Sequence, residues 1–469
     1  MKEDYNNERH RGRAILLSAI AALLVGVGIF FYYSFFRQAK SELIEAVPTD
    51  AQFLYEVNDN SAFSRDIVPL LPYFSEMFAM DALPAFETVH NALPDGPYDI
   101  TLSGHPQDNG IVLLFNTHID KAAFKRLLRA LSIDPANCET FEQQRIYTYG
   151  TNFKNLHFVF FNHILSISTN MELLKKSIIQ HRHPKNLLSA ADFRSLYDLA
   201  EKNRRQNWLF VSAAYIEGVS GTVAAESAEA IRAVAALSPW WAFQIRMSSH
   251  EVFLSGYTSS GDKMFQRLAG GNPGTPVPDH LLPCHCGQYY KLELSEGAVC
   301  HFSLPQDSTA SHRFLIVRRD TTGSAYSPFP TSRHEEEMMA AYPGGIIPVT
   351  DSIALPPSST LDTTRYTCFT RKGDSYLFAT SESAISAYNQ EMASNGNLAG
   401  NRYYKFAKGN IPSANLVEYT LLNPADTRHQ PGAPGKCPKT LRDLRVLSAS
   451  LNHLSDGYAS VNLYLNFMK

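Results

Sequence analysis

The clearest pattern in the sequence is an uninterrupted apolar run near its beginning. Residues 14–36 read AILLSAIAALLVGVGIFFYYSFF and contain no charged side chain. In a helix with a rise of about 1.5 Å per residue, these 23 residues span roughly 34 Å, enough to cross the hydrocarbon core of a bilayer. Aromatic side chains fill the last turns, and such rings favour the membrane–water interface. The run predicts a transmembrane anchor preceded by a short tail, residues 1–13.

The charges beside this anchor predict its orientation. Four cations precede it and two follow it: Lys2, Arg9, Arg11, Arg13, and then Arg37 and Lys40. The positive-inside rule places the tail in the cytoplasm and the bulk of the chain across the membrane. A cleaved signal peptide is the alternative, but its apolar region is usually about 7–15 residues long and ends at small residues. Ser18, Ala22 and Gly26 share one helix face, a spacing that favours a membrane-helix contact, although Ala/Gly-rich composition alone produces it too.

Beyond the anchor, the hydrophobic pattern predicts an α+β fold rich in antiparallel sheet. Apolar and polar residues alternate in Ala298–Leu304 and in Ala459–Leu465, as in half-buried strands. Helical spacing occurs in Ile119–Leu131, with Phe124, Leu127, Leu128 and Leu131 on one side, and a second helix is predicted over Asn170–Gln180. Short turns between strands indicate antiparallel pairing rather than parallel crossovers.

Two halves of the exported part resemble each other. HILSISTNMELLKKSI (His163–Ile178) corresponds to DSYLFATSESAISAYN (Asp374–Asn389), each predicting a strand, a turn and a helix, with Asn170 and Glu382 at the helix starts. Further segments correspond in the same order, among them the hairpin-like runs from Phe243 and from Leu447. The sequence therefore predicts an internal duplication, with halves at 47–278 and 279–469 joined through the Gly/Pro-rich Gly270–His280.

The halves differ in one connection. Ser220–Leu237 is an Ala-rich predicted helix, whereas the corresponding Pro424–Pro438 is a loop with four prolines. Variable connections on a rigid scaffold often carry function, and neutral drift of a surface connection is the alternative.

The order of these segments resembles a family. A single anchor is followed by VPTDAQFLYEVND, then by ILSISTNMELLKKSI and LLSAADFRSLYD. This order is similar to that of uncharacterised, membrane-anchored exported proteins of Gram-negative bacteria with a duplicated domain of unknown function. The resemblance covers most of 41–469 and implies an inner-membrane anchor with a periplasmic body. It implies no catalytic residues, and the second half departs from the pattern where Cys284-His285-Cys286 replaces Thr49-Asp50-Ala51.

Composition narrows the function classes. The chain is 44% hydrophobic and 19% charged, which is typical of a globular protein. Its net charge of −3 and the absence of a basic stripe disfavour nucleic-acid binding. The sequence contains no G-x-S-x-G, P-loop or G-x-G-x-x-G motif. The run from His334 to Glu337 lacks the second histidine of a zinc-protease helix.

Cysteines supply the sharpest metal hypothesis. Cys284, Cys286 and Cys300 are candidate soft ligands, with His280, His285 and His301 nearby in sequence, but their spacing departs from that of structural zinc sites. Six cysteines also permit disulfides in an oxidising compartment, or buried reduced thiols. His181 and His183 are better explained by a helix C-terminus, which favours cations.

Trp240 and Trp241 are a candidate partner surface if they are exposed, and core packing is the alternative. The leading hypothesis is a non-enzymatic binding or scaffold component of an envelope protein assembly, without a cofactor. Lipid or lipoprotein handling is the alternative, and a hydrolytic enzyme without a recognisable motif is the second alternative.

Overall fold

The structure, a computed structural model, gives two compact units. It describes residues 43–58, 99–107, 110–150, 155–201, 206–220, 235, 238–248, 251–259, 277–284, 288–294, 297–305, 311–318, 329, 331–350, 353, 365–410, 416–421, 446–454 and 457–466. The first unit comprises Met1–Ala51, Ala85–Leu102 and Leu113–Leu187, and the second comprises Gln52–Pro84, Ser103–Val112 and Leu188–Lys469. This grouping follows other boundaries than the predicted halves.

The predicted anchor, with Ser18, Ala22 and Gly26, lies outside the described residues. Within the part of the chain that the structure describes, no helix has the length and apolar character needed to cross a membrane.

The first unit is an antiparallel sheet between two helices. Its strands pair in the order β4-β5-β6-β7-β3: β4 (Cys138–Phe141), β5 (Gln144–Gly150), β6 (Asn155–Phe161), β7 (Ile164–Ser168) and β3 (Gly110–His118). Helix α5 (Lys121–Ala130) packs Phe124 against Tyr147 and Phe160 on one face. Helix α6 (Met171–Arg182) packs against β6 and β7, with His181 against Phe161. Because Phe160 and Phe161 point to opposite faces, the helices cover both faces.

Both predicted helices of this unit are confirmed. The Asp120 carboxylate accepts from the Ala123 backbone N–H at 2.6 Å, and this cap fixes the start of α5. Phe124, Leu127, Leu128 and Leu131 are all buried, as their spacing predicts. His181 lies in the last turn of α6 and His183 is its C-cap residue.

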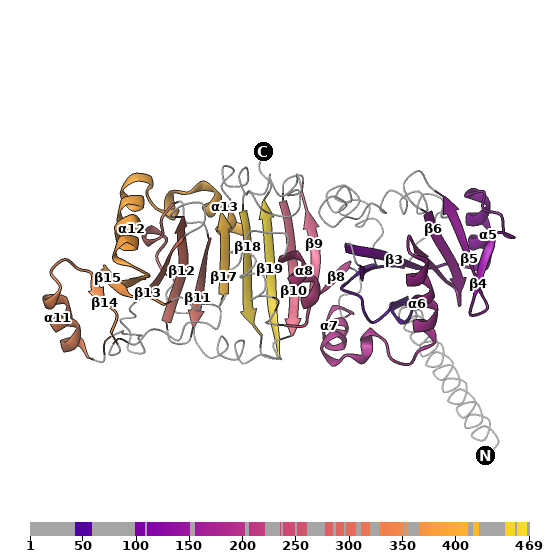
Figure 1. The fold of residues 1–469 in the computed structure, drawn as a ribbon, viewed down its shortest axis with the longest axis horizontal. Helices are drawn as coiled ribbons and strands as arrows, with labels where there is room; N and C mark the ends of the chain where they lie inside the picture. The colour runs from indigo at the N-terminus through magenta and orange to yellow at the C-terminus, as the bar shows by residue number, and fades with distance from the viewer. Residues whose placement is uncertain are drawn as a thin grey trace, which may run out of the picture. The chain divides into compact units, whose positions relative to one another are not determined.

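The second unit is built on a long antiparallel sheet (Figure 1). Strand β1 also pairs with β2 (Ile100–Gln107). From β1 the pairing continues without a break and is always antiparallel. The strands follow in this order: β1 (Phe53–Val57), β8 (Trp208–Ser212), β9 (Trp240–Met247), β10 (Glu251–Ser259), β19 (Tyr458–Asn466), β18 (Val446–His453), β17 (Leu416–Leu421), β11 (Gln288–Leu294), β12 (Gly297–Pro305), β13 (Ser311–Arg318), β16 (Ser375–Ala379), β15 (Cys368–Lys372) and β14 (Ile347–Pro348). The α+β prediction with antiparallel sheet is confirmed at this level.

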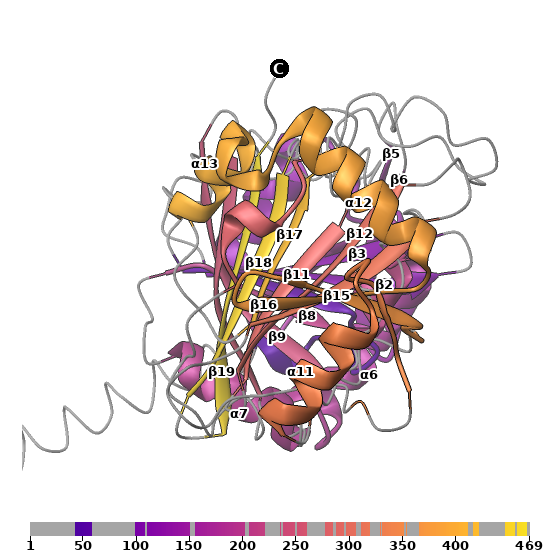
Figure 2. The ribbon, with the colours of Figure 1, turned by 90° about the vertical axis from the view of Figure 1, so that its left-hand side faces the viewer.

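Helices cover both faces of the second unit's sheet. Helices α12 (Glu382–Asn395) and α13 (Arg402–Asn410) lie toward the upper ends of the strands in both views, whereas α11 (Ser332–Ala341) lies at the lower end (Figures 1 and 2). Helix α7 (Ala191–Glu201) packs against β9 and β10. Helix α8 (Ala213–Ser220) follows β8 directly and was not identified from the sequence. Most of the predicted helix Ser220–Leu237 lies outside the described residues.

Two hydrophobic clusters occupy the two faces of this sheet. One lies under α12 and α13 and contains Phe302, Phe314, Tyr388 and Tyr404. The other lies on the opposite face and joins Trp241 and Phe243 of β9 to strands β12, β13, β15, β16, β18 and β19. Strand residues alternate between these clusters, which is the physical reason for the alternation in the sequence.

Corresponding elements recur at a constant spacing. Strand β7, helix α6, the 3-10 segment Leu187–Ser189 and helix α7 each begin 211 residues before β16, α12, the 3-10 segment Leu398–Gly400 and α13. The helix-start equivalence shifts by one residue, because Ser381 rather than Glu382 caps α12 as Asn170 caps α6.

One side-chain contact also recurs. The Ser177 hydroxyl on α6 donates to the Ala46 carbonyl at 2.7 Å, and the Tyr388 hydroxyl on α12 donates to the Leu281 carbonyl at 2.9 Å. Ser177 and Tyr388 hold the same position in their helices, 211 residues apart, and each accepting carbonyl lies in a short segment near the start of its half.

Candidate functional site

Strands β10 and β19 meet at a seam inside the second unit's sheet. The strands pair over nine residues, from Glu251 opposite Asn466 to Ser259 opposite Tyr458. Ser255 and Asn462 are the middle residues of the two strands and face each other. The pairing therefore has an approximate two-fold axis through this pair, which we call the seam axis. Along the chain, β10 and β19 are the closing strands of the two similar series of elements.

The seam presents different surfaces on its two faces. On the face that carries α7 and α13, Asn462 donates to the Ser450 hydroxyl at 3.2 Å, beside Ser255. On the opposite face, Leu254 lies across from Leu463, and both are partly buried against the cluster around Trp241 and Phe243. The seam thus combines a polar row on one face with a partly buried apolar row on the other.

A polar cluster lies at one end of the seam on the helix-bearing face, and we call it the Glu251 cluster. The Tyr464 hydroxyl donates to Glu251 Oε1 at 2.7 Å, and Asn466 Nδ2 lies 3.5 Å from the same oxygen and 3.1 Å from the Tyr464 hydroxyl. Burial raises the pKa of Tyr464, and its hydrogen bond to Glu251 adds to the rise. Tyr464 therefore remains a neutral donor to Glu251.

Two buried polar atoms of this cluster have no hydrogen-bond partner among the residues that the structure describes. They are Asn466 Oδ1 and Ser448 Oγ, in side chains that are 2% and 0% exposed. Ser448 is the cross-strand neighbour of Tyr464, and Asn466 is two residues further along the same face of β19. Buried polar atoms normally have partners, so the cluster has unused hydrogen-bonding capacity.

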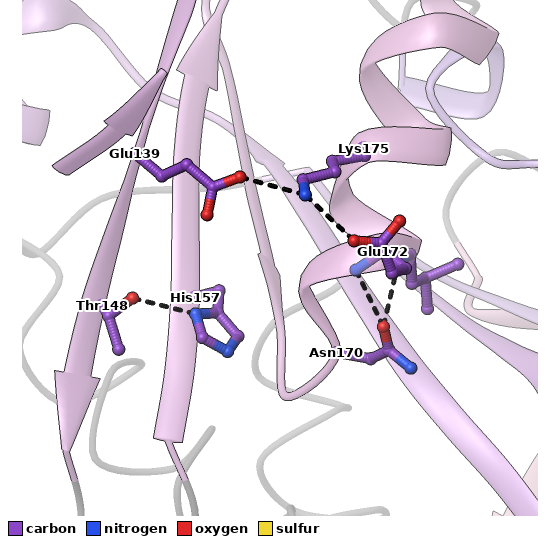
Figure 3. A network of polar contacts seen from close by, with 7 residues as sticks. Glu139, Thr148, His157, Asn170, Glu172 and Lys175 are labelled. Atoms are coloured by element: carbon purple, nitrogen blue, oxygen red, sulfur yellow. Dashed lines mark hydrogen bonds and ion pairs between the residues drawn. The ribbon is translucent and has the colours of Figure 1, made fainter. Parts of the chain in front are cut away.

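The first unit carries a second polar network, on the face covered by α6 (Figure 3). Lys175 Nζ lies 3.0 Å from Glu139 Oε1 and 2.9 Å from Glu172 Oε1, and Asn170 caps the helix below it. These carboxylates raise the pKa of Lys175, Glu172 first, so its ammonium group stays protonated. A protonated lysine is a poor nucleophile, and the Glu172 side chain is 76% exposed. We interpret this network as a structural contact that holds α6 against β4.

Histidines of the first unit predict a pH dependence. Burial lowers the pKa of His118, His157 and His181 below the ordinary value of 6.5. His157 Nδ1 is hydrogen-bonded to the Thr148 hydroxyl at 3.0 Å, and Asn162 Nδ2 lies 2.9 Å from His181 Nε2. These histidines have a lower pKa in the folded protein than in the unfolded chain, so the unfolded chain binds protons first as the pH falls. The unfolding free energy of this unit should therefore be highest above pH 6.5 and decrease below it.

We expect hydrogen exchange of residues 155–187, corrected for intrinsic rates, to show less protection at about pH 5.5 than at about pH 7.5. The variant His157→Gln removes one of the three groups and should show a smaller decline. Equal or greater protection at the lower pH would contradict the assignment.

The predicted metal ligands do not come together. Cys284 is half-buried beside Asn401, Cys300 is fully buried on β12, and Cys286 lies outside the described residues. Among the residues that the structure describes, no three His, Cys, Asp or Glu side chains are grouped to hold a metal ion. Cys138, Cys284 and Cys368 carry free thiols.

Trp240 and Trp241 do not form one exposed pair, so the predicted partner surface needs correction. As neighbours in β9 they point to opposite faces of the sheet. Trp241 is 1% exposed and stacks near Phe243, whereas Trp240 packs edge-on against Phe193 of α7, with ring centroids 4.8 Å apart. Core packing, the alternative, is what the structure has.

The polar cluster at the seam was missed from the sequence. Glu251 and Asn466 are distant along the chain, and only the strand pairing brings them together. The one related signal in the sequence was the similarity of the two halves, because β10 and β19 are the closing strands of the two similar series of elements. No protein family, curated protein or solved structure matches this chain.

Proposed function

We propose that the protein is a membrane-anchored periplasmic component of the cell envelope, and that its body binds a partner protein as a non-enzymatic scaffold. The apolar run 14–36, with the cations before it, supports an inner-membrane anchor with a cytoplasmic N-terminus. We also propose that the two halves are copies of one ancestral unit. The constant spacing of their elements and the recurring Ser177 and Tyr388 contacts support this duplication.

The observation that carries the binding proposal is the partly buried apolar row at the seam. Leu254 and Leu463 lie opposite each other on interior strands of a large sheet, yet neither is fully buried. Complete burial of a leucine side chain contributes about 1.5–3 kcal/mol, so a partner that covers the remaining exposed area of these leucines would gain part of that free energy. Apolar side chains that stay partly exposed on a rigid sheet suit a contact site for a partner.

Lipid handling is the second candidate, favoured by the same face. Leu209, Leu254, Leu463, Met338 and Met339 all lie partly buried at the margin of one cluster. Such a surface also suits an acyl chain, and methionine side chains adapt to irregular apolar ligands. If the ligand is a lipid, no other membrane protein should co-purify with this chain. If the ligand is a partner protein, that protein should co-purify with it.

The test is capture of the tagged full-length protein from gently solubilised native membranes, followed by quantitative mass spectrometry of proteins and lipids. We expect one reproducible protein in near-stoichiometric amount. Enrichment of lipid without a protein would favour the second candidate instead. Recovery of neither would contradict both, and the enzyme hypothesis would then take first place.

A further inference from the structure

We propose that the Glu251 cluster is a binding site for an organic cation with N–H donors, an ammonium or guanidinium group. Glu251 Oε1 accepts from Tyr464 and lies within reach of Asn466, while Oε2 accepts from no described residue. Asn466 Oδ1 is buried and lacks a donor. The cluster therefore offers two unused acceptors and one negative charge.

The charge of Glu251 has no ion-pair partner among the described residues. Arg246 lies on the same face of β9, diagonal to Glu251 through the pairing with Phe253, but its side chain is exposed and forms no ion pair with Glu251. Glu251 is only partly buried, so water can solvate its carboxylate in the free protein. A cation with N–H donors would replace that water with charge-assisted hydrogen bonds and could also donate to Asn466 Oδ1.

The opposite end of the seam serves as an internal comparison, because the seam axis relates the two ends. Tyr458 opens β19 where Glu251 opens β10, and Ser259 closes β10 where Asn466 closes β19. There the polar groups have partners: Ser259 is hydrogen-bonded to Ser238 at 2.8 Å, and the Tyr458 hydroxyl donates to the Ser195 carbonyl on α7 at 3.5 Å.

The third residue of each neighbouring strand shows the same contrast. It is Ala242 in β9 and Ser448 in β18, and each lies across from a tyrosine, Tyr257 or Tyr464. The Tyr458 end thus has an apolar alanine where the Glu251 end has a serine whose hydroxyl has no hydrogen-bond partner among the described residues. Of the two ends, and within the described part of the chain, the Glu251 end alone combines a carboxylate that has no ion-pair partner with buried polar atoms that have no hydrogen-bond partner, as a ligand site would.

An aromatic ring stands beside the same end. Phe406 of α13 is 44% exposed, and its centroid lies 6.4 Å from that of Tyr464. Aromatic rings attract guanidinium and ammonium groups through their electron-rich faces. An anion would be repelled by Glu251, so the ligand class is cationic.

The experiment is saturation-transfer difference NMR of methylguanidinium with the full-length protein in non-ionic detergent at constant salt. We expect a saturable signal, weakened about tenfold or more in Kd by Glu251→Gln, because the substitution removes the charge but keeps the shape. Tetramethylammonium, which has no N–H donor, should give no saturable signal. The variant Ser259→Ala, at the opposite end of the seam, should bind like the unchanged protein.

Two further arms sharpen the result. Ser448→Ala should also weaken binding, and it should fold, because alanine already holds the corresponding position 242.

A tripeptide with one central arginine distinguishes the two possible sources of the cation. Tighter binding of the tripeptide than of methylguanidinium indicates an arginine side chain of a partner protein, and equal binding indicates a small free cation. An unchanged Kd in Glu251→Gln, or no saturable signal, would mean ordered water only and would overturn the proposal.

Discussion

Replacing Phe193 with alanine is expected to cost about 3–5 kcal/mol of the unfolding free energy of the second unit. Phe193 is fully buried, and its ring lies 4.8 Å from Trp240, 5.3 Å from Phe210 and 5.9 Å from Tyr197, centroid to centroid. Removing the ring leaves a cavity between α7 and the sheet, because a strand face cannot collapse onto a helix without moving its neighbours.

Tryptophan fluorescence during urea unfolding measures this loss selectively. The chain has three tryptophans, Trp208, Trp240 and Trp241, and all belong to the second unit. Phe406→Ala is the matched control, because Phe406 is 44% exposed and should cost about 1 kcal/mol or less. If the two variants unfold at the same urea concentration, the packing of α7 described above is wrong.

Replacing Gly256 with alanine is expected to destabilise the seam by about 1–3 kcal/mol. A Cβ at this position would lie 1.8 Å from the Ala242 carbonyl oxygen, which is backbone and cannot rotate away. Strands β9 and β10 would have to separate at the point where β10 also pairs with β19.

Substitution of a second glycine, Gly218, is expected to change the stability in the opposite direction. A Cβ at Gly218, in α8, would meet nothing within 4 Å. Gly218→Ala should therefore stabilise the protein by about 0.4–1 kcal/mol, since alanine loses less backbone entropy on folding. Urea midpoints of the two variants, moving in opposite directions from that of the unchanged protein, are the expected outcome. A neutral Gly256→Ala would contradict the close strand approach.

Local elements were readable from the sequence because their determinants are local. The spacing of Phe124, Leu127 and Leu128 and the cap at Asp120 define α5, and alternation defines β12 and β19. The start of α12 was displaced by one residue because both Ser381 and Glu382 suit a helix N-terminus. Helix α8 was missed because Ala213–Ser220 follows an apolar strand with no turn signal between them.

The strand pairing at the seam could not be predicted from local patterns in the sequence. The pairing of β10 with β19 joins segments far apart in the sequence, and no local pattern specifies which strand a half-buried edge will meet. The opposite directions of Trp240 and Trp241 did follow from strand periodicity, and the error lay in treating adjacent aromatic residues as one surface. Glu251, Tyr464 and Asn466 became a candidate site only through the pairing.

Site-specific photo-crosslinking in native membranes tests the central claim, a partner at the seam, most directly. A photoreactive amino acid at Leu463 lies in the partly buried apolar row of the seam, and one at Ile179, 51% exposed on α6 of the first unit, is the control. The account predicts one discrete protein adduct from Leu463 and none from Ile179. No protein adduct from Leu463, or the same adducts from both positions, would contradict it.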